Sequence, residues 1–243
     1  MKKVLVVSDN LELVSFFQSE LQGAIEESNV QLTYAYTILN RAGDLFLEKG
    51  AVQIDMKDFS CVENIIKTYD LVLSLHCKQI FPANLVSQVE CVNVHPGFNP
   101  YNRGWYPQVF SIINKGPIGA TIHVMDAEVD SGPVIVQAET SILSSDTSLD
   151  VYNRVVSIEK SLLLSNIKKI FSGDYISKPT SHAGNYNSIK NFKDICALNL
   201  EAAGTLREHI DLLRALTHGE FGNAYFFDDN GQKVIVRISL ERE

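Results

Sequence analysis

Short apolar runs alternate with helically spaced apolar positions in the first part of the chain. The runs are typical of buried strands and lie at residues 3–7, 31–36, 52–56, 70–75 and 92–95. The segments between them predict helices over residues 11–24, 62–67, 82–89 and 103–115, while residues 37–50 show neither pattern clearly. Strands that alternate with helices predict a parallel, doubly wound α/β sheet.

The pattern changes in the second part of the chain. Two neighbouring strands are predicted at 119–125 and 133–138, separated by a short acidic loop, as a hairpin-like addition to the sheet. A long helix over 149–171 follows, and then a segment at 172–195 that is rich in Ser, Gly, Asn and Pro and is expected to be irregular.

The end of the chain predicts a compact piece of its own. A helix is expected over 205–216, and strands over 223–227 and 233–238 are joined by Asp228-Asp-Asn-Gly231, a strong hairpin signal. A hairpin this apolar on both strands must bury itself, either on its own domain or on a second subunit. We therefore expect a main domain over 1–185 and a C-terminal helix and hairpin over 186–243 that forms a homodimer.

Composition narrows the class of protein. With 243 residues, of which 45% are hydrophobic, the chain can bury a sizeable core, and a net charge of -8 argues against nucleic-acid binding. The cysteines show neither metal-ligand spacing nor a disulfide framework, so a reduced, cytoplasmic chain is the simplest interpretation. No apolar run approaches the ~20 residues of a membrane span, and the N-terminal run is too short for a signal peptide.

Several common site motifs are missing. The first strand ends in Ser8-Asp9-Asn10 rather than in a glycine-rich dinucleotide loop, and neither a P-loop nor a Gly-x-Ser-x-Gly elbow occurs. His95 and His123 lack short-spaced metal partners, so no metal is expected. Ser8 and Asn10 are interpreted either as helix caps or as groups that line the mouth of a ligand site.

Asn93, His95 and Asp130 are the candidates for chemistry. Asn93 and His95 lie two apart in a predicted strand and therefore share a face, at the carboxyl end where open α/β sheets bind ligands. An amide can stabilise an oxyanion, an imidazole can move a proton, and a carboxylate can orient the imidazole. The alternative is that His95 is a surface histidine and that Asp130 only shapes a turn.

Three motifs in this region resemble the formyltransferases that use 10-formyltetrahydrofolate. They are Val92-Asn-Val-His-Pro96, Gly119-Ala-Thr-Ile-His-Val-Met-Asp126 and Val129-Asp-Ser-Gly-Pro-Val134. The resemblance covers about residues 70–140 and implies a Rossmann-like, mostly parallel sheet. It also implies that Asn93, His95 and Asp130 are the family's catalytic trio and that 10-formyltetrahydrofolate is the formyl donor.

The segment Gly97–Phe110 resembles the sugar N-formyltransferases that act on dTDP-linked amino-dideoxysugars. It lacks the Ser-Leu-Leu-Pro stretch that is typical of glycinamide ribonucleotide and tRNA formyltransferases. The resemblance favours dTDP-4-amino-4,6-dideoxyglucose as acceptor, for O-antigen or surface polysaccharide synthesis. A dTDP-3-amino-3,6-dideoxyhexose, glycinamide ribonucleotide, or a non-catalytic binding role on the same scaffold stay open as alternatives.

The resemblance also implies two sets of binding residues. The folate is expected to contact two segments, mainly through backbone groups: Lys78, Gln79, Ile80 and Phe81, and Met125, Asp126, Glu128 and Val129. The nucleotide sugar is expected to contact cations, aromatic rings and small polar side chains: Lys78, Arg103, Tyr101, Trp105, Tyr106, Ser8, Asn10 and Asn102. Each charged residue could instead be a solvated surface charge, and each aromatic or apolar residue part of the core.

Overall fold

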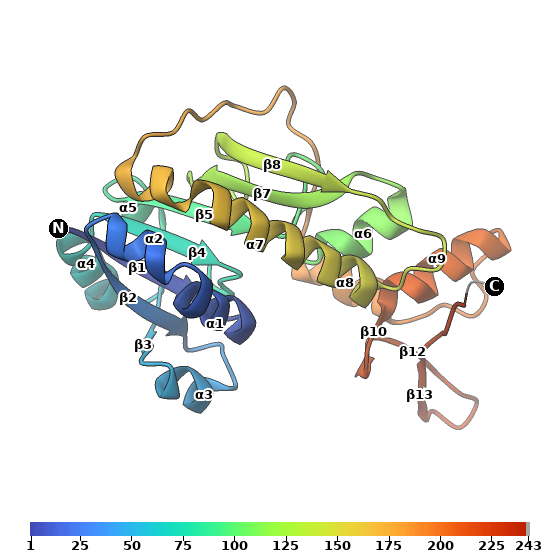
Figure 1. Ribbon diagram of the computed structural model, residues 1–243. Helices are drawn as coiled ribbons and strands as arrows, with labels where there is room; N and C mark the ends of the chain where they lie inside the picture. The colour runs from blue at the N-terminus through green and yellow to red at the C-terminus, as the bar shows by residue number, and fades with distance from the viewer. Residues whose placement is uncertain (242–243) are drawn as a thin grey trace. The chain divides into compact units, whose positions relative to one another are not determined.

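The computed structural model describes residues 1–241 and contains a seven-stranded sheet (Figure 1). The strand order is β3-β2-β1-β4-β5-β7-β8. The strands are β1 (Lys2–Ser8), β2 (Val30–Thr37), β3 (Val52–Ile54), β4 (Leu71–Leu75), β5 (Glu90–His95), β7 (Ile118–Val124) and β8 (Val134–Thr140). The pairs from β3 to β5 are parallel, and β7 runs antiparallel to β5. The predicted doubly wound, mostly parallel sheet is confirmed.

Nine helices occur within residues 1–241. They are α1 (Leu11–Glu20), α2 (Gln22–Glu27), α3 (Gly43–Glu48), α4 (Phe59–Thr68), α5 (Ala83–Val86), α6 (Pro107–Asn114), α7 (Ser148–Ser172), α8 (Ile189–Cys196) and α9 (Leu206–Leu216). None of them combines the length and the apolar character that crossing a membrane requires.

The chain forms two compact units, which are described separately. The first consists of Met1–His95, Thr121–Gln137 and Ile158–Ser181, and the second of the intervening residues together with those from His182 onward. Strands β7 and β8 and helix α7 contribute residues to both. The predicted boundary at residue 185 stays a prediction.

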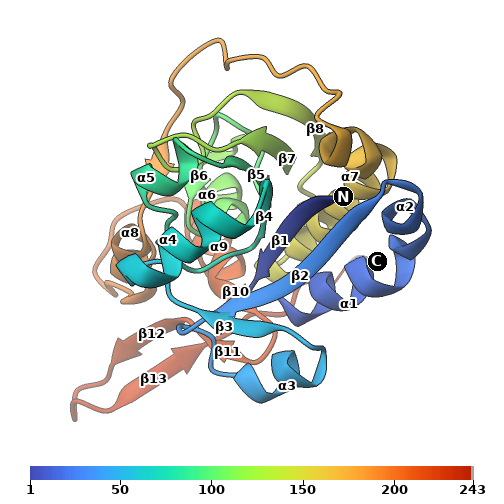
Figure 2. The same cartoon turned by 90° about the vertical axis from the view of Figure 1, so that its left-hand side faces the viewer.

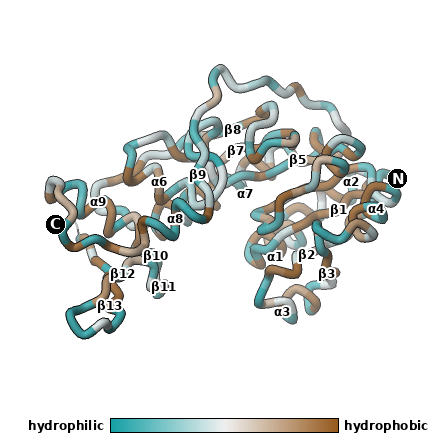
Figure 3. The backbone as a smooth tube through the Cα atoms, turned by 180° about the vertical axis from the view of Figure 1, so that it is seen from behind, coloured by the Kyte–Doolittle hydropathy of each residue, from teal (hydrophilic) through white to brown (hydrophobic). Residues whose placement is uncertain are grey.

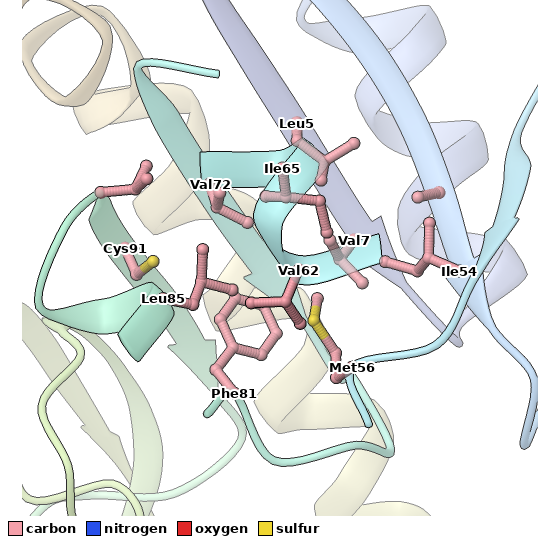
Figure 4. Packing of buried hydrophobic residues seen from close by; sticks show 12 residues of the cluster. Leu5, Val7, Ile54, Met56, Val62, Ile65, Val72, Phe81, Leu85 and Cys91 are labelled. Atoms are coloured by element: carbon pink, nitrogen blue, oxygen red, sulfur yellow. The ribbon is translucent and has the colours of Figure 1, made fainter. Parts of the chain in front are cut away.

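In the first unit, helices cover both faces of the strands (Figure 2). Val62 and Ile65 of α4 pack with Leu5 and Val72 of the strands, in a cluster that Figure 4 shows from close by. Helix α1 buries its own apolar side chains, among them Phe17. Apolar residues follow β1 through this core (Figure 3), which explains why its sequence is a continuous apolar run rather than an alternating one.

Three sequence predictions were wrong in detail. The unassigned segment 37–50 contains α3, and the segment 172–195, expected to be irregular, contains most of α8, which begins in a capping box of Ser188 and Asn191. The helix expected over 103–115 begins only at Pro107, because Tyr106 before it has a left-handed backbone with φ 52°. Residues 103–104 form the short strand β6 (Arg103–Gly104) instead.

The second unit adds small antiparallel ribbons. They are β10 (Thr217–His218) with β11 (Phe221–Gly222), and β12 (Ala224–Phe227) with β13 (Lys233–Val236). The predicted hairpin is therefore confirmed. Strand β9 (Tyr186–Asn187) pairs with β6 in the same unit.

A charge network holds α9 in the second unit. Arg214 is 4% exposed; its Nε donates to Asp211 at 2.6 Å, and its Nη1 donates to the carbonyl oxygens of Leu143 and Asp146. Lys115, just after α6, also pairs with Asp211. Burial alone would raise the pKa of Asp211, but the two cations outweigh it and hold the pKa below its usual range.

Replacing Asp211 with Asn should lower the free energy of unfolding at pH 7 by about 3 kcal/mol, because a buried guanidinium loses its counter-charge. Since the folded pKa of Asp211 is depressed, its contribution is present above the unfolded pKa and is lost as the pH falls through the folded pKa. The loss in Asp211→Asn should therefore shrink in acid. Urea titrations at several pH values measure it.

The matched control is Asp194→Asn, which breaks the exposed pair with Lys190. An exposed pair of this kind contributes about 0.5 kcal/mol or less. Equal losses in the two variants would show that the Asp211 network contributes no more than a surface pair.

Candidate active site

Asn93 and His95 end strand β5 on one face of the sheet. Both are buried, and the antiparallel register places Asn93 opposite His123 and His95 opposite Thr121 of β7. Side chains directly opposite on paired strands lie on the same face. Four polar side chains therefore meet where β5 ends, in the first unit, as the spacing of Asn93 and His95 predicted for two of them.

Asp130 reaches this cluster from the loop between β7 and β8. Asn93 donates to Asp130 through Nδ2 at 2.9 Å, and Nδ1 of His95 lies 3.4 Å from the Asp130 carboxylate. The backbone of Asp130 is left-handed, with φ 52°. A Cβ on Gly132 would lie 1.9 Å from the carbonyl oxygen of Val124, so this close approach of loop to strand requires glycine. The structure thus brings the predicted trio together.

His123 is a member of the cluster that sequence reasoning missed. Its Nε2 lies 3.3 Å from Nδ2 of Asn93 and 3.5 Å from Oδ1 of Asp130. Its ring meets the His95 ring edge-on, with centroids 6.4 Å apart. Only the strand register, which a single sequence does not reveal, places His123 beside Asn93.

Two cysteines near these elements are poor nucleophiles. Burial raises the pKa of Cys91, in β5, to about 12, and burial likewise raises the pKa of Cys77, after β4, to about 12. Near neutral pH both thiols are protonated, so the polar cluster rather than a thiolate carries any chemistry here.

The segment 78–81, expected to contact a folate, alternates between buried and exposed side chains. Gln79 accepts from the backbone of Met56 and donates to Asp55, and Phe81 belongs to the apolar core. Lys78 and Ile80 are exposed, and Ile80 is 68% exposed. Of the four side chains, only Lys78 and Ile80 are therefore available to a ligand, while Gln79 and Phe81 hold the segment in place.

The second expected folate segment forms an exposed turn. The backbone N–H of Met125 donates to the carbonyl of Cys91, which ties the start of the turn to β5. Asp126 accepts from the backbone of Glu128 and from the hydroxyl of Ser131, which closes the turn. Val129, next to Asp130, is half-buried.

Asp9 fixes the end of β1 to the neighbouring elements. Its carboxylate accepts from the backbone and hydroxyl of Thr37, from Asn40, and at 2.7 Å from the backbone N–H of Lys78. This one side chain ties the ends of β1 and β2 to segment 78–81. The same contact occupies the Lys78 N–H, so a ligand must use other backbone groups of the segment.

Ser8 and Asn10 serve the fold. Ser8 is fully buried and its hydroxyl bonds to the backbone of Asn10. Oδ1 of Asn10 accepts from Leu13, which caps α1, while Nδ2 lies 3.3 Å from Nδ1 of His76. His76 in turn contacts the buried carboxylate of Glu159 at 2.8 Å. Of the two interpretations, the helix cap accounts for both side chains.

The expected sugar-binding residues at 101–106 lie in the second unit. Asn102 is 1% exposed, and its side chain bonds with Ser111, Asn114, Asn185 and Asn187. It therefore joins three parts of the unit, and its amide is engaged internally. Its role is structural in this arrangement.

The aromatic residues beside Asn102 form a cluster. Tyr106 stacks on Phe192 of α8, with ring centroids 4.0 Å apart, and Trp105 lies 5.8 Å from Tyr106. Tyr101 meets the ring of His182 at 5.2 Å. Arg103 is half-buried in β6. Phe192 lies in the segment expected to be irregular, so the sequence did not connect it with this cluster.

Among the described residues, no group of three or more His, Cys, Asp or Glu side chains is arranged to hold a metal ion. The expectation that the reaction needs no metal stays a prediction.

Replacing Asp9 with Ala should lower the free energy of unfolding by about 2–3 kcal/mol, since several donors lose one buried acceptor. Amide hydrogen exchange at Lys78 and Thr37 should become faster in the variant. Asp229→Ala, in the exposed hairpin turn, is the control and should change stability by about 0.5 kcal/mol or less. Unchanged exchange at Lys78 would contradict the role of Asp9 as an anchor.

Sequence comparisons agree with this geometry. Residues 61–167 match the "Formyl transferase" family model, and residues 191–242 match the "N-formyltransferase dimerization C-terminal domain" model. The chain is 51% identical to the dTDP-4-amino-4,6-dideoxyglucose formyltransferase of Mycobacterium bovis over 182 residues, which are 75% of this chain and 78% of that protein.

Solved structures extend the likeness to the whole chain. A sugar N-formyltransferase from Shewanella is 47% identical with a TM-score of 0.97, covering 100% of this chain and 99% of the other. A 4-N formyltransferase from Francisella tularensis is 44% identical with a TM-score of 0.91 and the same coverage.

A more distant structure shares the fold. The N-formyltransferase from Helicobacter canadensis, in complex with folinic acid and dTDP-3-aminofucose, is 21% identical with a TM-score of 0.69, covering 88% of this chain and 80% of the other. At this identity the likeness concerns the fold alone. The family models, the curated relative and the two close structures, together with the Asn93, His95 and Asp130 cluster, establish that the chain belongs to the formyl transferase family.

Proposed function

We propose that the chain transfers the formyl group of 10-formyltetrahydrofolate to the amine of a dTDP-linked amino-dideoxysugar. The best acceptor is dTDP-4-amino-4,6-dideoxyglucose, and the product serves O-antigen or related surface polysaccharide synthesis in the cytoplasm. The observation that carries this proposal is the buried cluster at the end of β5, in which Asp130 contacts both Asn93 and His95. The named relative at 51% identity and the 4-N formyltransferase at 44% support the acceptor.

His95 moves the proton in this reaction. Asp130 lies on the Nδ1 side of its ring, where the carboxylate orients the imidazole and favours its cationic form. In the proposed reaction, the other ring nitrogen, Nε2, accepts a proton from the acceptor amine as the new N–C bond forms. The same nitrogen then donates that proton to the folate nitrogen as the old C–N bond breaks, so His95 ends the cycle neutral.

Asn93 stabilises the negative charge that develops on the formyl oxygen. Its amide nitrogen is held at 2.9 Å by Asp130, which fixes the direction of its hydrogens. One hydrogen-bond donor aimed at a developing oxyanion typically contributes ~10²–10³ in rate. No covalent bond to the protein is needed, because the acceptor amine is itself the nucleophile.

The ligands are assigned to residues with available groups. Lys78 and Ile80 and the turn 125–129 are proposed to contact the folate, on the basis of the exposed side chains and the fixed backbone of both segments. Lys78 and Arg103 are proposed to bind the pyrophosphate. Trp105, Tyr101 and Tyr106 are proposed to pack on the sugar or the thymine.

The acceptor is tested by mixing the protein with 10-formyltetrahydrofolate and each of three amines. These are dTDP-4-amino-4,6-dideoxyglucose, a dTDP-3-amino-3,6-dideoxyhexose and glycinamide ribonucleotide. The 4-amino sugar should gain the mass of one formyl group while tetrahydrofolate appears. Preference for the 3-amino sugar would establish the alternative acceptor, and turnover of none would refute the proposal.

Replacing His95 with Asn should lower kcat by about 10²–10⁴-fold, the usual contribution of a general acid–base group. His209→Asn, on the surface of α9, is the matched control and should retain wild-type kcat. Circular dichroism and thermal unfolding check that both variants fold. Near-normal turnover by the His95 variant would remove this residue from the mechanism.

The C-terminal hairpin is proposed to form a homodimer. Phe221, Phe227 and Ile235 expose apolar side chains there, and Figure 3 shows apolar strands ending in a polar tip. The match to a dimerization domain over 191–242 supports this assignment. Tyr225 and Phe227 share a face of β12 and pack edge to face.

Phe227→Asp should convert a dimer into a monomer, because it places a charge in the proposed apolar interface. Phe59→Asp is the control, since Phe59 is 72% exposed in the first unit and lies outside the hairpin. Light scattering measures the molar mass of both variants at equal concentration. A monomeric wild-type protein, or a dimeric Phe227→Asp variant, would contradict the proposed interface.

A further inference from the structure

The carbonyl oxygen of Val124 determines how His123 presents its ring to the cluster. Nδ1 of His123 lies 2.9 Å from this oxygen. A carbonyl oxygen only accepts hydrogen bonds, so Nδ1 must carry the proton. In the neutral ring Nε2 is then a lone pair, and it faces Nδ2 of Asn93 at 3.3 Å.

The amide of Asn93 is complementary to this lone pair. Its nitrogen has two hydrogens; one is donated to Asp130 at 2.9 Å and the other is directed at Nε2 of His123. Two acceptors on the nitrogen side disfavour the flipped amide, which would set its oxygen against the Asp130 carboxylate and the ring lone pair. His123 therefore reinforces the orientation that Asp130 selects.

The charge state of His123 also matters to His95. The titratable groups around Asp130 in this cluster are His95, 3.4 Å away, and His123, 3.5 Å away. A neutral His123 leaves the single carboxylate to stabilise the charge that His95 acquires. A cationic His123 would instead donate to Asp130 and compete for it.

We propose that His123 is a positioning residue for formyl transfer, acting as the neutral Nδ1–H tautomer that orients the Asn93 amide. The proposal rests on the proposed function for its kinetic consequence, and on the geometry of Asn93, His123 and Val124 alone for the tautomer. It adds a fourth residue to the trio. His123 acts through Asn93 and Asp130 and does not itself exchange protons with substrate.

Two substitutions separate the two bonds of His123. Asn in its place keeps a donor near the Nδ1 position for the Val124 carbonyl but loses the acceptor for Asn93. Gln places an amide oxygen near the Nε2 position and restores that acceptor. His123→Asn should lower kcat by about 10-fold or more with little change in KM, since misplacing a catalytic group costs up to ~10²-fold. His123→Gln should stay within a few-fold of wild type.

Coupling to Asn93 gives a second kinetic test. In an Asn93→Ala background the amide that His123 orients is gone, so His123→Asn should cost little further activity. A purely structural His123 would reduce thermal stability in both single variants, with no difference in kcat between Asn and Gln. Equal kcat values for these two variants, or additive losses with Asn93→Ala, would overturn the positioning role.

The tautomer is measurable without any substrate. In protein labelled with ¹⁵N-histidine, the ring-nitrogen chemical shifts of His123, assigned by comparison with His123→Gln, should show a protonated Nδ1 and an unprotonated Nε2 at neutral pH. A cationic ring or the Nε2–H tautomer would overturn the proposal. Because this readout needs no turnover, a wild-type protein that formylates no sugar would refute the proposed function while the tautomer is still decided.

Discussion

The antiparallel register between β5 and β7 is the constraint on which the site depends. It sets Asn93 directly opposite His123 and His95 opposite Thr121, so one face of two strands carries all four polar side chains. A shift of one residue would turn both Asn93 and His95 to the other face. The Asp130 carboxylate then has a fixed amide and two imidazoles to contact, and its own position is all that remains to be set.

Backbone features of the β7–β8 loop set that position. Asp130 has a left-handed conformation, and Gly132 allows the loop to approach the Val124 carbonyl more closely than any side chain would permit. The same strand residue, Val124, receives the Nδ1–H of His123 through its carbonyl oxygen. Loop geometry and histidine tautomer are thus determined at one place on β7, which makes the cluster a single rigid arrangement.

Sequence reasoning reached what depends on short-range periodicity. Residues two apart in a strand share a face, so Asn93 and His95 were predicted together, and the family resemblance added Asp130. His123 was missed because its role depends on pairing between two strands. Gln79 and Asn102 were expected to contact ligands, yet their amides satisfy internal donors and acceptors, which only the tertiary contacts reveal. Helix α8 escaped notice because its capping residues, Ser188 and Asn191, read as loop composition.

The division of the chain into two units gives the proposed chemistry and the proposed specificity separate physical bases. Asn93, His95, His123 and Asp130 all belong to the first unit, whereas Arg103, Trp105 and Tyr106 belong to the second. The polar cluster has no feature that depends on the acceptor beyond an attacking amine. Changes in the aromatic cluster, such as the Tyr106–Phe192 stack, leave the contacts of Asp130 untouched. Acceptor choice can therefore vary across this fold while the formyl-transfer groups stay the same, and for that reason the acceptor has to be inferred from the segment after His95.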